Sequence, residues 1–311
     1  MFSSVSPETN IALYADDTKI WRRITLFSDH FILQNDINNL FEWSVRNKMV
    51  FHPSKCKALS VTLQRNDLDN LPFNIFLYEI NGTCIEYVNS QKDLGVDINT
   101  NLTWGPHYNM LVLQASSKLG LLRRTCHFTA SVRQKRSFYL AIVRSLFEHC
   151  SQVWSPQYVS HLVKFENIQR RAIKWINGEP FCSYSEEKYM EELKKLKILP
   201  LKLKFLYNDL TLFYKIVNQL VPINLPDNVT RFDAEGSRLT RQNAAVHDRT
   251  DVTRYSCCIV PTIDALKNSF FFRTVRNWNC LPVSVRQSTS LTMFKSTLMD
   301  FLWSPDTDWP D

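Results

Sequence analysis

Residues 11–21 read Ile-Ala-Leu-Tyr-Ala-Asp-Asp-Thr-Lys-Ile-Trp, in which two adjacent acids separate two apolar runs. This pattern is typical of a β-hairpin, so we predict a hairpin with an acidic tip. Strands disfavour Asp, and neighbouring carboxylates repel each other. A divalent cation relieves that repulsion, and Mg²⁺ is often held by one or two carboxylates together with substrate phosphates. The alternative interpretation is a solvated turn, in which Asp is a common residue.

The sequence that follows the hairpin predicts one helix and several short strands up to residue 103. Ser28 and Asp29 are suitable N-terminal caps for the helix, whose apolar residues recur at helical spacing as far as Trp43. A second hairpin is predicted around the turn Asn81-Gly82. Strands are predicted at residues 57–63, 73–80, 83–88 and 91–98.

From residue 104 onward the apolar residues recur with helical spacing. Helices are predicted at residues 107–124, 132–150, 160–177, 185–197, 201–220, 262–279 and 290–302. Gly178 is placed to cap the third of these. Residues 221–256 are polar and contain prolines, which predicts an irregular connection. The predicted fold class is therefore α+β, a small antiparallel sheet with helices followed by a mostly α-helical region.

Composition excludes several classes of protein. The chain has 311 residues, 44% of them hydrophobic and 13% aromatic, which is too apolar for a disordered chain. No apolar run approaches the roughly 20 residues of a membrane span, and the first ten residues lack the pattern of a signal peptide. We therefore expect an intracellular protein, in the cytoplasm or nucleus, with no membrane partner. The eight cysteines are expected to be reduced thiols.

The net charge of +7 is concentrated in the middle of the chain. Residues 118–204 carry 17 Lys and Arg against seven Glu and no Asp, a net +10. Residues 1–117 carry −3, and residues 205–311 are neutral. Such an excess indicates either a surface that faces a polyanion or a set of solvated Lys-rich helix faces.

Several motifs, in this order along the chain, resemble one known family. Residues 13–18, Leu-Tyr-Ala-Asp-Asp-Thr, are similar to the Tyr-Ala-Asp-Asp motif of reverse transcriptases. The helix at 33–44 and the stretch Phe51-His52-Pro53-Ser54-Lys55-Cys56 resemble the segments that follow this motif in jockey-like non-LTR retrotransposons, with His52 in place of Asn. Residues 94–107 resemble the primer-grip hairpin leading into the thumb. Further matches are the segments 153–156, 168–172, 183–184 and 278–282.

The resemblance implies roles for particular residues. Asp16 and Asp17 would bind catalytic Mg²⁺, with Asp16 the more important of the two. Lys55 would face the triphosphate or the leaving pyrophosphate, where a cation offsets developing negative charge. Gly95 would let the backbone approach the primer strand closely.

The resemblance also implies an RNA template and a DNA primer as partners. In the family the thumb follows the template–primer duplex along its phosphates, which gives affinity without sequence preference. The candidate phosphate contacts are Lys118, Arg123, Arg124, Arg133, Lys135, Arg136, Arg170, Arg171 and Lys174. Arg170 and Arg171 cannot share one helix face, so we expect at least one of them to be structural, for example paired with Glu166.

Only 13 residues precede Tyr14, too few for the fingers and the earlier palm strand that carries another metal-binding Asp in this family. We therefore expect the C-terminal part of a polymerase that is inactive alone. The expected regions are a partial palm with the primer-grip hairpin at 1–103, a helical thumb-like region at 104–220, an irregular connection at 221–261 and a C-terminal helical segment at 262–311. The alternatives are a non-catalytic nucleic-acid-binding protein that uses the thumb surface, and a helical interaction module.

Overall fold

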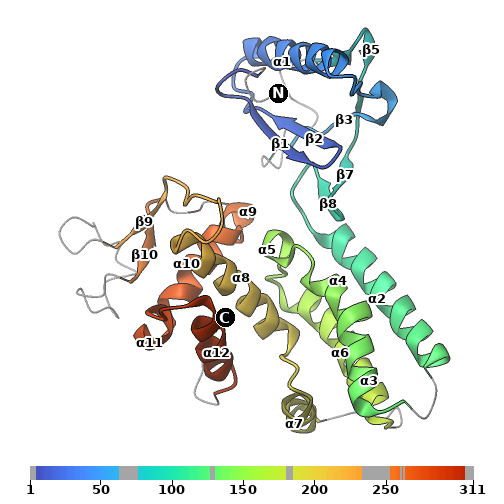
Figure 1. Cartoon of the computed structure of the whole chain (residues 1–311), viewed down its shortest axis with the longest axis vertical. Coiled ribbons are helices and arrows are strands. Elements are labelled where there is room, and N and C mark those ends of the chain that lie inside the picture. The colour runs from blue at the N-terminus through green and yellow to red at the C-terminus, as the bar shows by residue number, and fades with distance from the viewer. Residues whose placement is uncertain are drawn as a thin grey trace. The chain divides into compact units, whose positions relative to one another are not determined.

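The computed structural model describes residues 5–62, 76–126, 130–179, 185–232, 253–259, 261 and 263–304. It divides the chain into two units, residues 1–103 and residues 104–311 (Figure 1). In the first unit the described residues form short strands and one long helix, whereas those of the second unit are mostly helical. The predicted α+β class is therefore confirmed.

The predicted acidic hairpin is confirmed. Strands β1 (Asn10–Tyr14) and β2 (Asp17–Trp21) pair antiparallel, with Tyr14 opposite Asp17. The two-residue turn between them is Ala15-Asp16, and Ala15 has φ 51°. A left-handed residue at the first turn position matches the twist of the two strands, which keeps the hairpin short.

Helix α1 (Phe27–Arg46) follows and begins earlier than predicted, with Leu26 at the N-cap; Asp29 lies inside the first turn and caps the helix N-terminus from there. The Asp29 carboxylate accepts hydrogen bonds from the backbone N–H groups of Leu26 and Thr25, both at 2.8 Å. These two hydrogen bonds hold the pKa of Asp29 well below its usual value. Ser28, the other predicted cap, lies inside the helix because α1 begins at Phe27. The helix buries Ile37 against the core of the first unit.

The other strands of the first unit are shorter than predicted. The turn at Asn81-Gly82 is confirmed, since it joins two antiparallel strands, but each pairs over only two residues. A parallel pair links the segment after residue 56 to the segment after residue 85, again over two residues. These strands are β3 (Lys57–Ala58), β4 (Glu79–Ile80), β5 (Thr83–Cys84) and β6 (Glu86–Tyr87). Residues 63 and 73–75 of the predicted strands lie outside the described residues.

The prediction of a single strand at 91–98 is wrong. The segment forms a hairpin of β7 (Ser90–Asp93) and β8 (Val96–Asn99), paired antiparallel. Its turn residues Leu94 and Gly95 have φ 45° and 90°. Two successive residues with positive φ reverse the chain within two positions, so the apolar alternation on either side belongs to two strands.

The second unit begins with a group of helices close to the predicted ones. They are α2 (Gly105–Thr125), α3 (Val132–Phe138), a π-helix (Tyr139–Arg144), α4 (Ser145–Glu148), α5 (Ser151–Trp154), α6 (Val159–Asn177), α7 (Glu186–Leu196) and α8 (Leu201–Val217). The predicted helix at 132–150 thus changes to π geometry in its middle and ends before Cys150, which has φ 50°. Gly178 caps α6 with φ 71°, as predicted.

The C-terminal part of the second unit packs around α8. Its elements are β9 (Val229–Arg231), β10 (Tyr255–Cys257), α9 (Asp264–Lys267), α10 (Phe270–Asn279), α11 (Val283–Arg286) and α12 (Leu291–Leu302). Aromatic side chains form its core, in which Tyr214 stacks on Phe294 with ring centroids 4.3 Å apart. The predicted helix at 262–279 is therefore interrupted before Phe270, and the connection at 221–256 includes two paired strands.

A buried ion pair joins two helices of the second unit. The Arg273 guanidinium on α10 donates to both carboxylate oxygens of Asp209 on α8, at 2.8 and 3.1 Å. It also donates to the carbonyl oxygens of Asn268 and Gln152. Both members of the ion pair are almost fully buried, so these four hydrogen bonds offset the cost of removing two charges from water.

No helix among the described residues is long and apolar enough to cross a membrane.

Candidate catalytic hairpin and nucleic-acid surface

The two faces of the β1–β2 hairpin have different surroundings. Because directly opposed residues of an antiparallel pair share a face, Tyr14, Asp17 and Lys19 lie on one face and Ile20 lies on the other. Ile20 packs against the core cluster of the first unit. Tyr14 is 65% exposed, and Asp17 and Lys19 are exposed as well. The acidic residues therefore stand at a tip and on a face that is open to a ligand.

Asp16 and Asp17 are both exposed, and neither has a hydrogen-bond or ion-pair partner in the described part of the chain. Two adjacent carboxylates without a cationic partner fit a divalent cation, which favours oxygen ligands. The described residues contain no group of three or more His, Cys, Asp or Glu side chains that could hold a metal ion. This tip thus presents two exposed carboxylates, so a divalent cation bound there would need water or phosphate oxygens to complete its coordination shell.

The structure joins this hairpin to the β7–β8 hairpin. Lys19 Nζ donates to Asp93 Oδ2 at 2.5 Å across 74 positions of sequence. Asp93 is the last residue of β7, directly before the turn that contains Gly95. The acidic hairpin and the predicted primer-grip hairpin are therefore in contact. Sequence reasoning missed Lys19 and Asp93, because two single charges this far apart carry no periodic or motif signal.

Lys55 lies at the end of a 3₁₀ turn, Pro53–Lys55, and its side chain is exposed. The turn is supported by a contact between Ser54 Oγ and His52 Nδ1 at 2.9 Å. In the described part of the first unit, Asp16 and Asp17 make no ion pair with Lys55. The structure thus leaves Lys55 as an exposed cation, available to a phosphate.

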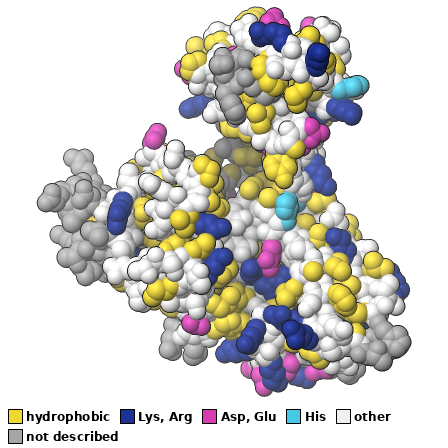
Figure 2. Space-filling model, in the orientation of Figure 1, with side chains coloured by type: hydrophobic (Ala, Val, Ile, Leu, Met, Phe, Trp, Pro, Cys, Tyr) yellow, Lys and Arg dark blue, Asp and Glu magenta, His cyan; other side chains and the backbone are white. Residues whose placement is uncertain are grey.

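The nine predicted phosphate-contact residues are not equivalent. Lys118, Arg123, Arg124 and Arg133 are exposed on α2 and α3. Lys135, Arg171 and Lys174 are half-buried. Figure 2 shows Lys and Arg side chains distributed over the visible face of the molecule and interspersed with apolar ones. The exposed members are therefore the best candidates for contact with a polyanion.

Arg136 and Arg170 make contacts within the protein. Arg136 donates from Nε to the carbonyl oxygen of Leu196 at 2.6 Å and from Nη2 to that of Lys197 at 3.3 Å, which closes the C-terminal end of α7. Arg170 forms an ion pair with Glu186 and stacks on the Tyr189 ring, 4.0 Å from its centroid.

The prediction that one of the two adjacent arginines is structural holds for Arg170, but the predicted partner is wrong. Glu166 instead accepts hydrogen bonds from the Tyr189 hydroxyl, from Gln169 and from the backbone N–H of Leu201. Its carboxylate ties α6 to α7 and to the start of α8. Helix α7 packs beside α6, so Arg170 on α6 pairs with Glu186 in the first turn of α7. The spacing of residues along α6 alone does not reveal this partner.

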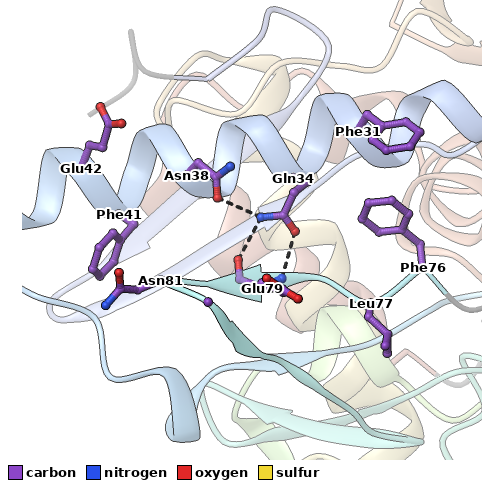
Figure 3. Close-up of a pocket in the computed structure, with 10 residues that line it drawn as sticks. Phe31, Gln34, Asn38, Phe41, Glu42, Phe76, Leu77, Glu79 and Asn81 are labelled. Atoms are coloured by element: carbon purple, nitrogen blue, oxygen red, sulfur yellow. Dashed lines mark hydrogen bonds between the residues drawn. The ribbon is translucent and has the colours of Figure 1, made fainter.

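A groove of about 510 Å³ lies between α1 and the β4–β5 hairpin (Figure 3). Phe31 and Phe76 line one end, and Phe41 lines the other. In its middle the Gln34 amide accepts from the backbone N–H of Glu79 and donates to its carbonyl oxygen, both at 2.9 Å. Gln34 thus hydrogen-bonds the backbone N–H and C=O groups of Glu79 at the edge of β4, as a neighbouring strand would. The lining includes acids and no Lys or Arg, so the groove does not suit a phosphate.

Comparison with known proteins finds relatives among transposon polymerases. A probable RNA-directed DNA polymerase from transposon BS of Drosophila melanogaster is 24% identical over 179 residues, which are 55% of this chain and 19% of that protein. The RNA-directed DNA polymerase from mobile element jockey of Drosophila funebris is 25% identical over 179 residues, which are 56% of this chain and 19% of that protein. No family model and no solved structure matches the chain.

The match thus spans about a fifth of the length of these curated relatives. The similarity to these two polymerases agrees with the resemblance that the ordered motifs indicate, and the hairpin with its two exposed acids is present in the fold. On these grounds the chain is distantly similar, over about half of its length, to RNA-directed DNA polymerases of a transposon and of a mobile element.

Proposed function

We propose that this chain is the C-terminal part of an RNA-directed DNA polymerase of a non-LTR retrotransposon, comprising half of a palm, a thumb and a C-terminal helical segment. The observation that carries the proposal is the acidic turn Ala15-Asp16 on a hairpin that contacts the Gly95 hairpin through Lys19 and Asp93. A polymerase needs this combination, since the metal-binding carboxylates have to lie close to the end of the primer.

In this proposal Asp16 and Asp17 hold Mg²⁺, which in such an enzyme stabilises the attacking and leaving oxygens of nucleotidyl transfer. The exposed Lys55 faces the phosphates of the incoming nucleotide. Gly95, with φ 90°, forms a turn without a side chain, so the primer backbone can come close to it. Two carboxylates do not hold two metal ions in a stable clamp, so the isolated chain binds Mg²⁺ weakly and does not extend a primer.

The helices of the second unit supply the thumb in this proposal. Four exposed cations on α2 and α3, and three half-buried ones on α3 and α6, provide the charge for contact with the phosphates of a template–primer duplex. Arg136 and Arg170 are excluded from this set because their guanidinium groups are held within the protein. Such binding is independent of sequence and sensitive to salt.

The test is primer extension by the full chain on a poly(rA)/oligo(dT) duplex with Mg²⁺ or Mn²⁺, compared with Asp16→Ala. Asp300→Ala, an exposed acid on α12, is the matched control. We expect no incorporation above background. Incorporation that disappears in Asp16→Ala and persists in Asp300→Ala would overturn the predicted inactivity and support a complete active site.

The same preparation tests the proposed function through binding. The chain should bind a labelled RNA–DNA hybrid with an affinity that falls as salt rises. A folded chain that shows no affinity for the hybrid at low salt would favour a helical interaction module. Binding that is unchanged when Asp16 and Lys55 are replaced, together with an absence of metal binding, would favour a non-catalytic nucleic-acid-binding protein.

A further inference from the structure

Two residues of β2, Asp17 and Lys19, lie on the same exposed face of the hairpin. Side chains two positions apart on a strand are separated by about 6.6 Å along it. A Lys ammonium on its four-carbon stem spans this distance, so Lys19 is able to reach the Asp17 carboxylate. An ammonium paired with Asp17 would occupy an oxygen that a metal ion needs and would repel the ion.

In the structure Lys19 points elsewhere. Its Nζ contacts Asp93 Oδ2 at 2.5 Å and lies 6.0 Å from the centroid of the Trp21 ring. The Asp93 side chain is 34% exposed and the Lys19 side chain 53% exposed, so the pair lies at the surface between the two hairpins. Asp93 therefore accepts the one cation on β2 that is close enough to compete for Asp17.

We propose that Asp93 is a positioning residue that holds the Lys19 ammonium away from Asp17, and so keeps the acidic turn available to a divalent cation. The inference rests on the proposed metal-binding role of Asp16 and Asp17. It predicts an asymmetry between the partners. Loss of Asp93 releases Lys19 onto Asp17, whereas loss of Lys19 removes the competitor.

Zero-length carbodiimide coupling of the full chain tests the ion pair without any metal. The reagent joins an ammonium to a contacting carboxylate as an amide and takes up the water that is lost. We expect a Lys19–Asp93 link in the wild type. In Asp93→Asn we expect a Lys19–Asp17 link instead, which mass spectrometry detects as an uncleaved Lys19 with the mass of one water missing.

The matched control is Asp97→Asn, which removes an acid from the same hairpin at the position opposite Lys92. This variant should keep the Lys19–Asp93 link, and Lys57–Glu86, another ion pair of the first unit, reports that the reaction works. A wild type in which Lys57–Glu86 is linked and Lys19–Asp93 is not would overturn the proposal. So would an Asp93→Asn chain that forms no Lys19–Asp17 link.

Mn²⁺ binding followed by electron paramagnetic resonance tests the consequence. We expect Asp93→Asn to weaken Mn²⁺ binding several-fold, Lys19→Met to leave it equal or tighter, and the double variant to recover the wild-type affinity. Equal weakening in both single variants would indicate only a structural link between the hairpins and would refute the proposal. Absence of any Mn²⁺ binding that depends on Asp16 and Asp17 would count against the proposed function, while the cross-linking result still decides the positioning role.

Discussion

Charge reversal at three exposed arginines, Arg123, Arg124 and Arg133, changes the surface charge of the second unit and should leave its folding nearly unaltered. The triple change to Glu leaves Arg136 intact, because Arg136 closes the end of α7 through two carbonyl oxygens. We expect the variant to bind an RNA–DNA hybrid more weakly at every sequence tested, since phosphate contacts carry no base information.

The magnitude follows from counter-ion release. If the seven remaining candidates neutralise about six phosphates, log affinity falls with log salt at a slope of about −5 on a duplex treated as B-DNA. Loss of three contacts reduces the slope to about −2.7. The assay is fluorescence anisotropy of a labelled hybrid across a salt series. A control with the same change in net charge, Arg231, Lys267 and Arg276 to Glu, should keep a slope close to that of the wild type.

The free energy of unfolding distinguishes these three exposed arginines from Arg136. Exposed charges contribute little to folding, so the triple variant should unfold within about 0.5 kcal/mol of the wild type. Arg136→Glu leaves two carbonyl oxygens without their donor and should cost about 1–3 kcal/mol. Contact between these three arginines and phosphates is refuted if the triple variant retains the full salt slope, or if the control loses as much slope as the triple variant.

Two further predictions concern folding. Arg273→Leu leaves the buried Asp209 carboxylate unpaired and should cost about 3–5 kcal/mol in urea unfolding, whereas the exposed Arg276→Leu on the same helix should cost little; a loss below about 1 kcal/mol would contradict the buried ion pair. Asp29→Ala should destabilise the first unit at neutral pH, because the pKa of Asp29 is lower in the folded chain than its usual value of about 3.9. This contribution is fully present above that value and is lost as pH falls from it towards the lower pKa of the folded chain. Acid unfolding of this variant against Glu42→Ala on the same helix measures the effect, and a stability difference from the wild type that does not shrink as pH falls below about 4 would contradict the capping role.

Local sequence signals predicted most of the helices, and they predicted the two hairpins whose turns have characteristic residues, at 11–21 and at Asn81-Gly82. The acidic hairpin at 11–21 and the turn at Asn81-Gly82 depend on neighbouring residues alone, and both form as predicted. Helix α6 and its cap at Gly178 depend on apolar spacing and one glycine. These features are local because their hydrogen bonds close within a few residues.

Strand lengths and the second hairpin required the tertiary structure. The alternation at 91–98 continues through Leu94 and Gly95, so sequence alone did not reveal the reversal between β7 and β8. Likewise the described part of the strand predicted at 57–63 pairs with β6 over only two residues, and Thr62 donates its backbone N–H to Thr100 instead. Strand pairing depends on a partner distant in sequence, and neither period nor propensity specifies it.

The sequence by itself determined the acidic turn, the excess of positive charge in residues 118–204 and the identity of the residues available for chemistry. The tertiary structure decided which charges remain available. It placed Lys19 on Asp93, Arg136 on the end of α7 and Arg170 on Glu186. The physical reason is that the interaction of a charged group depends on its distance in space from other polar groups. In each of these three cases the partner comes from a different part of the chain.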